Sequence, residues 1–333
     1  MKKYLSMLVA LVAMIVMVAC TNDDIPMGNT VTFKVNPNTV VSPFTYEFSA
    51  GELEQIDSDE KLRLRLFVYD NAGNLVNKAE ELVSSYTNIV NMPLSLASGN
   101  YTIIGTSDVV QPGSKVPEFW GFSGEQQLNT LTITDLGYIG AQAKILGVAK
   151  SQVSVSSDTR DVSINLAPAG SVIYVLVRSI HQYSNVTHYG LVCNKTTDAL
   201  LFDNNGNTLF DVKQQDGMVY VMAKISTGNT GDNIYTMNYI FPMTTAKYQF
   251  VYYEGDSFYD LGSEMTINNT TQAGKEYLFS MDMSASDYAI SLKDVTGQRR
   301  SAPQRVAAAR AQDGAAGLPL LKNDPVRVVD LVK

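Results

Sequence analysis

The stretch Lys61–Tyr69 has the sequence KLRLRLFVY and is followed at 70–74 by DNAGN. Its leucines alternate with Arg63 and Arg65, and this period of two predicts a β-strand with one apolar and one basic face. Asp, Asn and Gly tolerate the backbone of a tight hairpin turn, so we expect the chain to reverse at 70–74 and to return from Leu75. The unit is the clearest structural pattern in the 333-residue chain.

Short segments of the same kind extend from about residue 29 to residue 293, separated by polar turns. Segment 31–35 alternates with period two, 93–105 is a strand–turn–strand unit, and 153–155 with 162–166 predicts a hairpin around Asp158. Further strands are expected within 172–177, 200–209, 248–253 and 273–279. Tyrosine is abundant, with 18 residues, which favours strands over helices. The sequence therefore predicts an all-β fold.

Two local motifs occur twice in the same order. The turn at 70–74 returns as DNNGN at 203–207, and a glycine followed by a tyrosine at a strand start occurs in 97–103 and in 273–279. Two related β-domains in tandem explain this most simply, and strands at this spacing favour sandwiches over a closed barrel or a propeller. We expect an N-terminal β-sandwich domain at 29–168 and a C-terminal β-sandwich domain at 169–296.

The N-terminus has the anatomy of a secretory signal, with MKK at 1–3, an apolar run at 5–18, and Ala19 before Cys20. This ending resembles the lipobox of bacterial lipoproteins. The resemblance implies a signal peptide at 1–19, cleavage before Cys20, and acylation of its thiol and new amino group. Two or more acyl chains anchor a protein stably. An ordinary signal peptide or an N-terminal anchor helix is the alternative.

The polar segment 20–28 is expected to be a lipidated tether. Its Asp23 and Asp24 resemble the surface-export signal of Bacteroidales-type lipoproteins, or belong to a solvated linker without an address. The tail at 297–333 is rich in Ala and Arg, unlike the body. We expect it to be disordered or a translation artefact. Two alternatives are a short helix around Ala307 and a β-prone segment, 325–332, that adds to another subunit's sheet.

The charge and the reactive side chains argue against several classes of function. The chain has 33 acidic and 25 basic residues, which disfavours non-specific nucleic-acid binding. With Cys20 acylated, Cys193 has no partner for an intrachain disulfide. His181 and His188 have no further ligands at metal-binding spacing. The segment from Asp203 superficially resembles a calcium loop, but its sixth and twelfth residues do not match, so a hairpin turn is expected.

No nucleophile elbow or phosphate loop is present in the sequence. We therefore expect no catalysis, no cofactor and no metal, although paired carboxylates at 57–60 or 254–256 leave a hydrolase as a distant alternative. One aromatic cluster, Phe119, Trp120 and Phe122, has two interpretations. Exposed, it would form a stacking platform for a sugar ring; buried, it would close one end of a sandwich. We favour burial, because large aromatic side chains contribute most in a core.

The order of these motifs resembles the fimbrillin superfamily, most closely its FimB-like lipoprotein anchor subunits of type V fimbriae. The matching pieces are Cys20, the strand 62–69 with its turn, the segment 96–101, the aromatic segment 119–122 and the segment 272–277. The resemblance spans roughly residues 1–293. It implies two transthyretin-like β-sandwich domains and a non-catalytic role in attaching or terminating a fimbria at the outer membrane, on the cell surface. The implied partners are fimbrial shaft subunits, bound by β-strand addition, and the membrane, bound through acyl chains.

Shaft subunits of this superfamily are cleaved after an arginine, which frees a groove for a neighbour's strand. Here no arginine lies between Cys20 and Arg63, and both Arg63 and Arg65 lie inside a predicted strand. The chain therefore resembles an unprocessed subunit that keeps its lipid and its first strand. The alternative function is a surface lipoprotein that binds a glycan or a host protein through loops such as 119–122.

Overall fold

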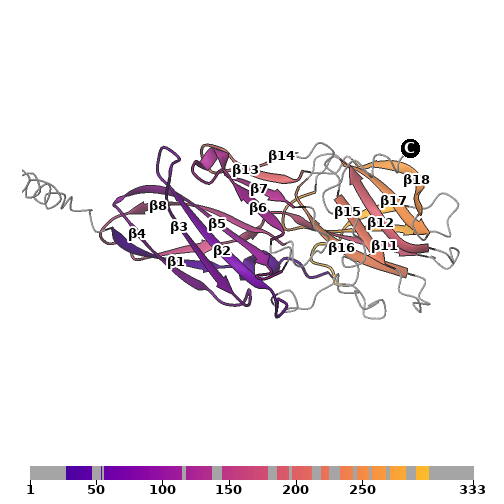
Figure 1. The fold of residues 1–333 in the computed structure, drawn as a ribbon, viewed down its shortest axis with the longest axis horizontal. Helices are drawn as coiled ribbons and strands as arrows, with labels where there is room; N and C mark the ends of the chain where they lie inside the picture. The colour runs from indigo at the N-terminus through magenta and orange to yellow at the C-terminus, as the bar shows by residue number, and fades with distance from the viewer. Residues whose placement is uncertain are drawn as a thin grey trace, which may run out of the picture.

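A computed structural model gives the fold of the chain (Figure 1). The structure describes residues 28–46, 54, 56–114, 118–136, 145–178, 186–194, 197–211, 219–224, 233–242, 246–254, 257–267, 271–282 and 290–299. Helix is confined in these ranges to α2 (Asn38–Val41) and the short 3-10 helix η1 (Leu128–Thr130). The remaining regular elements are strands, so the predicted all-β fold is confirmed. No helix within these ranges is long and apolar enough to cross a lipid bilayer.

The N-terminal half is a sandwich of two sheets. The smaller sheet has the order β4-β1-β9 and the larger one the order β10-β8-β5-β2-β3. Their apolar faces share one core, to which β1 contributes Val31, Phe33 and Val35, and β2 contributes its three leucines. The strand bounds are β1 (Asn29–Asn36), β2 (Lys61–Tyr69), β3 (Leu75–Val83), β4 (Val90–Leu96), β5 (Gly99–Val110), β8 (Gly147–Val155), β9 (Asp161–Asn165) and β10 (Ala167–Pro168).

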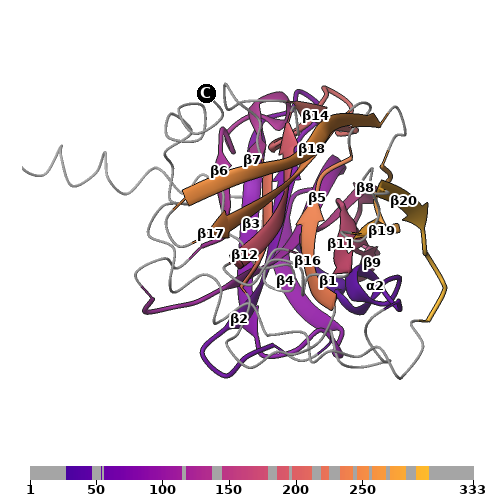
Figure 2. The same cartoon turned by 90° about the vertical axis from the view of Figure 1, so that its right-hand side faces the viewer.

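The C-terminal half is a second sandwich, with sheets in the orders β16-β11-β19-β20 and β15-β12-β17-β18. Figure 2, seen from the C-terminal half, shows these two sheets on opposite sides of that half. The strand bounds are β11 (Ser171–Arg178), β12 (Val186–Asn194), β15 (Val219–Lys224), β16 (Asn233–Ile240), β17 (Ala246–Glu254), β18 (Ser257–Ile267), β19 (Glu276–Asp282) and β20 (Ile290–Asp294).

The two halves repeat one topology. In each half the first strand, β1 or β11, lies between an antiparallel neighbour, β4 or β16, and a parallel neighbour, β9 or β19. In the second sheet β2 pairs with β3 and β5, as β12 pairs with β15 and β17. This repetition gives the two-sandwich architecture that the sequence predicts. The domain limits at 168 and 296 stay predictions.

Each half also carries an inserted hairpin. One is β6 (Trp120–Ser123) with β7 (Thr132–Asp135), and the other is β13 (Ala199–Phe202) with β14 (Thr208–Asp211). Strands β7 and β13 pair, so the two hairpins form one four-stranded sheet, β14-β13-β7-β6. Figure 1 shows this sheet close to where the halves meet. A sheet shared between the halves restricts their relative movement.

One predicted pairing is wrong. The segments 153–155 and 162–166 do not form a hairpin, because β8 pairs with β5 and β9 pairs with β1 in the opposite sheet. The connection around Asp158 crosses from one sheet to the other. The same polar turn residues occur in a connection between two sheets and in a hairpin within one sheet, so the local sequence does not distinguish these two kinds of connection.

Candidate functional site

The first strand, β1, is the centre of its sheet. It pairs antiparallel with β4 from Asn29 to Val35 and parallel with β9 from Thr32 to Asn36. Its inward side chains Val31, Phe33 and Val35 are all 0% exposed. Removing β1 would therefore open a groove between β4 and β9 and expose their apolar residues to water.

The predicted lipid site, Cys20, lies outside the described residues. The described chain begins at Gly28, directly before β1. An anchor at Cys20 would thus connect to the folded protein through β1. The other cysteine, Cys193, and His188 both lie in β12, whereas His181 lies outside the described residues.

The far end of β1 leads through α2 to a buried carboxylate of the C-terminal half. Glu276, at the start of β19, is 0% exposed. Its Oε2 accepts a hydrogen bond from the backbone N–H of Thr45 at 3.0 Å, and its Oε1 accepts one from the N–H of Tyr46 at 3.0 Å. The hydroxyl of Tyr174 donates to Oε1 at 2.7 Å. These bonds connect the segment that follows β1 and α2 to strands β11 and β19 of the other half.

Burial raises the pKa of Glu276, although its hydrogen bonds with Tyr174, Thr45 and Tyr46 act in the opposite direction. Tyr239 provides a second connection between the two halves. Its hydroxyl donates to the carbonyl of Leu146 at 2.9 Å and accepts a hydrogen bond from the N–H of Gly170. A Cβ at residue 170 would lie 2.3 Å from a backbone oxygen. Only glycine therefore fits where the chain enters the C-terminal half.

The aromatic cluster at 119–122 is divided between two environments. Trp120 is 0% exposed and packs against Phe241 at 4.9 Å and against the edge of Tyr239 at 6.3 Å, both from the C-terminal half. Phe119 is half-buried against the core. Phe122 is also half-buried, but it stacks on Phe67 of β2 at 6.3 Å. The three side chains do not form one exposed stacking platform.

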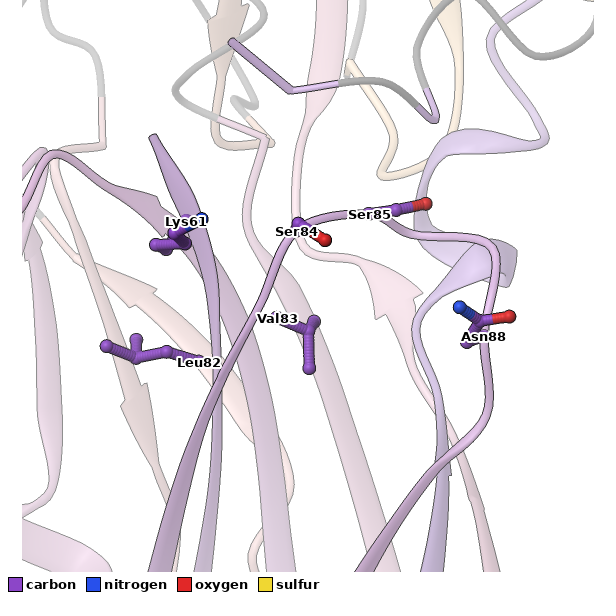
Figure 3. Close-up of a pocket in the computed structure, with 6 residues that line it drawn as sticks. All are labelled: Lys61, Leu82, Val83, Ser84, Ser85 and Asn88. Carbon is purple, nitrogen blue, oxygen red and sulfur yellow. The ribbon is translucent and has the colours of Figure 1, made fainter. Parts of the chain in front are cut away.

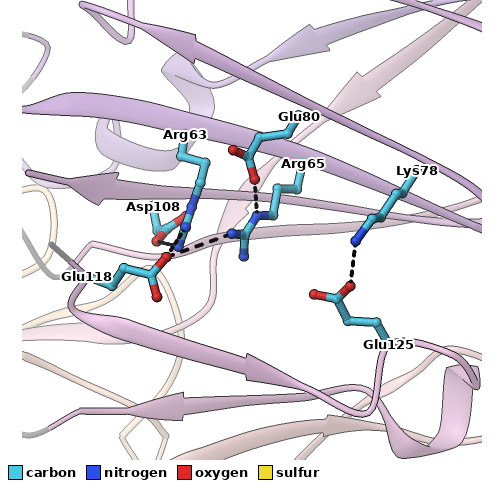
Figure 4. Close-up of polar contacts among 7 residues, drawn as sticks. All are labelled: Arg63, Arg65, Lys78, Glu80, Asp108, Glu118 and Glu125. Carbon is cyan, nitrogen blue, oxygen red and sulfur yellow. Dashed lines mark hydrogen bonds and ion pairs between the residues drawn. The ribbon is translucent and has the colours of Figure 1, made fainter. Parts of the chain in front are cut away.

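The basic face of β2 is covered by β6 and carries an ion-pair network that the sequence analysis missed (Figure 4). Arg63 is only 4% exposed and Asp108 is 0% exposed. Arg63 donates from Nε to Asp108 Oδ1 at 3.1 Å and from Nη2 to Oδ2 at 2.7 Å, and its Nη1 donates to Glu118. A carboxylate inside the apolar end of β5 is the sequence signal that could have indicated a buried cation.

The cationic groups also pack on an aromatic ring. The guanidinium of Arg65 lies 4.3 Å from the Phe122 ring centroid and that of Arg63 lies 5.5 Å from it. Burial alone disfavours the charge of Arg63, but the hydrogen bonds and charges of Asp108 and Glu118 outweigh it and raise the Arg63 pKa. Each acid and base here is engaged by a partner, so the network serves structure rather than proton transfer.

A pocket of about 330 Å³ lies at the C-terminal end of β3 (Figure 3). Its lining consists of Lys61, Leu82, Val83, Ser84, Ser85 and Asn88. It contains no histidine, cysteine or carboxylate, so it offers no acid–base pair for catalysis. Across the part of the chain that the structure describes, no group of three or more His, Cys, Asp or Glu side chains is arranged to hold a metal ion.

The chain was compared with known proteins. A scan against protein-family models found no match, and neither did a search of curated proteins. Solved structures, in contrast, are similar in fold. A candidate polysaccharide-binding protein from Bacteroides thetaiotaomicron matches with a TM-score of 0.51 and 13% identity, over 80% of this chain and 96% of that one.

Two further solved structures match at a TM-score of 0.50. A candidate adhesin from Bacteroides thetaiotaomicron has 12% identity over 80% of this chain and 97% of that chain. The fimbrial anchor protein Mfa2 from Porphyromonas gingivalis has 10% identity over 80% of this chain and 95% of that chain. Because nearly the full length of each structure is covered, the likeness is one of overall fold and not of a single local motif.

Proposed function

We propose that this chain is a lipid-anchored, non-catalytic fimbrial subunit that attaches or terminates a fimbria at the outer membrane, on the cell surface. The observation that carries the proposal is the position of β1. This strand fills the centre of its sheet, and no arginine precedes it after Cys20. In the resembling shaft subunits, cleavage after an arginine frees the corresponding groove. A chain that keeps its lipid and its first strand suits an anchor better than a shaft.

The interior position of Arg63 supports the same proposal. It lies in β2, between β3 and β5, and is nearly inaccessible. A protease would have to unfold the larger sheet to cleave there. The likeness in fold to the fimbrial anchor protein Mfa2 is further support. Partner subunits would bind by main-chain pairing along a sheet edge, with alternate side chains filling pockets.

Lipidation can be tested with the two cysteines as a matched pair. Cells of a Bacteroidales-type host that express the chain would be fed an alkyne analogue of palmitate. We expect the label and membrane retention in wild type and in Cys193→Ser, and neither of them in Cys20→Ser. A freely secreted product with an unmodified residue 20 would refute the anchor.

The partner can be tested by cross-linking in native membranes, followed by capture of the tagged chain and mass spectrometry. We expect a shaft subunit with the same tandem β-sandwich pattern and an arginine in its N-terminal loop. Recovery of a glycan-uptake complex in its place would refute the fimbrial role.

A second candidate function is glycan binding. It is favoured by the likeness in fold to a candidate polysaccharide-binding protein, but the burial of Trp120 argues against a platform at 119–122. Under this alternative, Phe119→Ala would abolish retention on a glycan array under conditions where urea unfolding shows that the variant is still folded. Unchanged retention would exclude this loop.

A further inference from the structure

The order of the strands determines how a pull on the N-terminus is carried. Gly28 enters β1 at the end of the N-terminal half that also holds the turns after β4 and β8 (Figure 1). The other end of β1, at Asn36, lies beside Asn165. From there β9 continues through β10 into β11 of the C-terminal half. The neighbouring strands β1 and β9 are thus parallel. A pull enters β1 at its N-terminal end and passes on from β9 at its C-terminal end, which lies at the opposite end of the sandwich.

We infer that β1 and β9 form a mechanical clamp that resists a pull applied between the N-terminus and the C-terminal half. Such a pull slides β1 along β9, so their hydrogen bonds are loaded together and must break together. In a strand peeled from one end, by contrast, the bonds break one at a time. The evenly spaced bonds of a parallel ladder suit this shared loading.

Several contacts oppose the sliding of β1. The N–H of Thr32 donates to the carbonyl of Arg160 at 2.8 Å, and the N–H of Leu166 donates to the carbonyl of Asn36 at 3.2 Å. Between them, Lys34 Nζ forms an ion pair with Asp161 at 2.8 Å. The buried side chains of β1 would also be drawn past the apolar side chains of the facing sheet.

A second hold lies where the segment after β1 reaches the C-terminal half. If β1 slides free, the released chain remains attached where Glu276 binds the N–H groups of Thr45 and Tyr46. The freed segment is therefore 29–44, about 6 nm of extended chain at roughly 3.6 Å per residue. Because β1 already spans about 2.6 nm of this in the fold, at about 3.3 Å per residue, the measured gain in length is about 3 nm. This length identifies the event in a pulling experiment.

The proposal rests on the proposed function only for the claim that the load enters at the membrane end. The test is single-molecule pulling of the non-lipidated mature chain held by its two ends. We expect a high-force event that lengthens the molecule by about 3 nm. Lys34→Ala should lower the force of that event. The matched control is Lys78→Ala, which removes the exposed ion pair with Glu125 at 3.0 Å outside the clamp and should leave the force unchanged.

A reversible lock gives a second measurement on one molecule. Lys34 and Ser163 are register partners on β1 and β9. Neighbouring strands lie about 4.8 Å apart, which is within the Cα separation that a disulfide spans. With Cys20 and Cys193 replaced by serine, Lys34→Cys and Ser163→Cys should remove the event of about 3 nm when oxidised and restore it when reduced. Equal forces for Lys34→Ala and Lys78→Ala, or the same event in both redox states, would overturn the clamp. Neither outcome depends on lipidation, whose absence would refute only the proposed function.

Discussion

Replacing Asp108 by alanine is the most informative single perturbation of the N-terminal sandwich. Asp108 is 0% exposed and accepts two hydrogen bonds from Arg63, which is itself only 4% exposed. The substitution leaves a buried guanidinium with two donors unpaired. Removing one partner of a buried ion pair costs about 3–5 kcal/mol. Glu118 still accepts a hydrogen bond from Arg63 Nη1, and the guanidinium still lies near the ring of Phe122. We therefore expect the free energy of unfolding to fall by about 3 kcal/mol, at the lower end of that range.

The assay is urea unfolding at neutral pH. At a slope of about 1–3 kcal/mol per molar urea, this loss lowers the midpoint by about 1 M or more. The matched control is Glu80→Ala, which removes an exposed partner of Arg65 at 2.8 Å and should cost less than about 1 kcal/mol. Replacing both Arg63 and Asp108 by leucine should recover most of the loss, because no charge is then left buried.

The same variants can be treated with an arginine-specific protease. Wild type and Glu80→Ala should resist cleavage after Arg63, whereas Asp108→Ala should be cut there, because the weakened sheet opens more often. If Asp108→Ala loses less than about 1 kcal/mol, or is as stable as Glu80→Ala, the pair does not hold this sheet together and the reasoning is wrong.

Three further predictions concern the junction and the turns. Trp120→Ala should lower the free energy of unfolding by about 3–5 kcal/mol in urea, because the indole fills a closed space between the halves; a loss typical of a surface site would contradict this. Gly206→Ala should lower the free energy of unfolding by about 1–2 kcal/mol, because Gly206 has a positive φ of 76°. The loss should exceed that of Gly73→Ala, whose φ of 81° is similar. The reason is space: the new Cβ would lie 3.1 Å from Thr102 at position 206, but 3.6 Å from its nearest neighbour at position 73. Glu276 has a pKa raised by burial, so folded protein binds more protons than unfolded protein between the ordinary and the raised pKa. The stability of wild type relative to Glu276→Gln should therefore fall as pH rises through that window, and thermal midpoints that differ equally at all pH values would refute it.

The strands and turns follow from local sequence. The alternating segment 61–69 coincides with β2, and the predicted turn follows it. The structure adds that Asp70 Oδ1 stabilises this turn by accepting hydrogen bonds from the N–H groups of Ala72 and Asn74 at 2.9 Å each. The turn at 203–207 repeats this arrangement around Asp203. A period of two and a residue's tolerance of positive φ are properties of a few neighbouring residues, so they can be inferred without the rest of the chain.

The tandem repeat of two β-domains was predicted from two sequence motifs, but the two copies of each motif do not lie at equivalent positions in the two halves. The turn at 70–74 joins β2 to β3, whereas the turn at 203–207 lies in the inserted hairpin β13–β14. The segment 97–103 begins β5, whereas 273–279 begins β19, which corresponds to β9. The two halves repeat their strand pairing, not these motifs. Equivalent strands need only similar apolar alternation, which many sequences satisfy.

The amino-acid sequence by itself determined that the chain is built of strands, where several of them lie, where the turns at 70–74 and 203–207 fall, and that no arginine lies between Cys20 and the first strand. Only the tertiary structure decided which strands pair, that β1 lies between β4 and β9, and that Arg63 meets Asp108 in the interior. It also decided that Trp120 lies between the halves and not on a surface. The physical reason is the distance along the sequence over which each effect acts. Backbone preference and alternation act between close neighbours in sequence, whereas pairing, burial and charge compensation depend on residues that the chain brings together only when it folds.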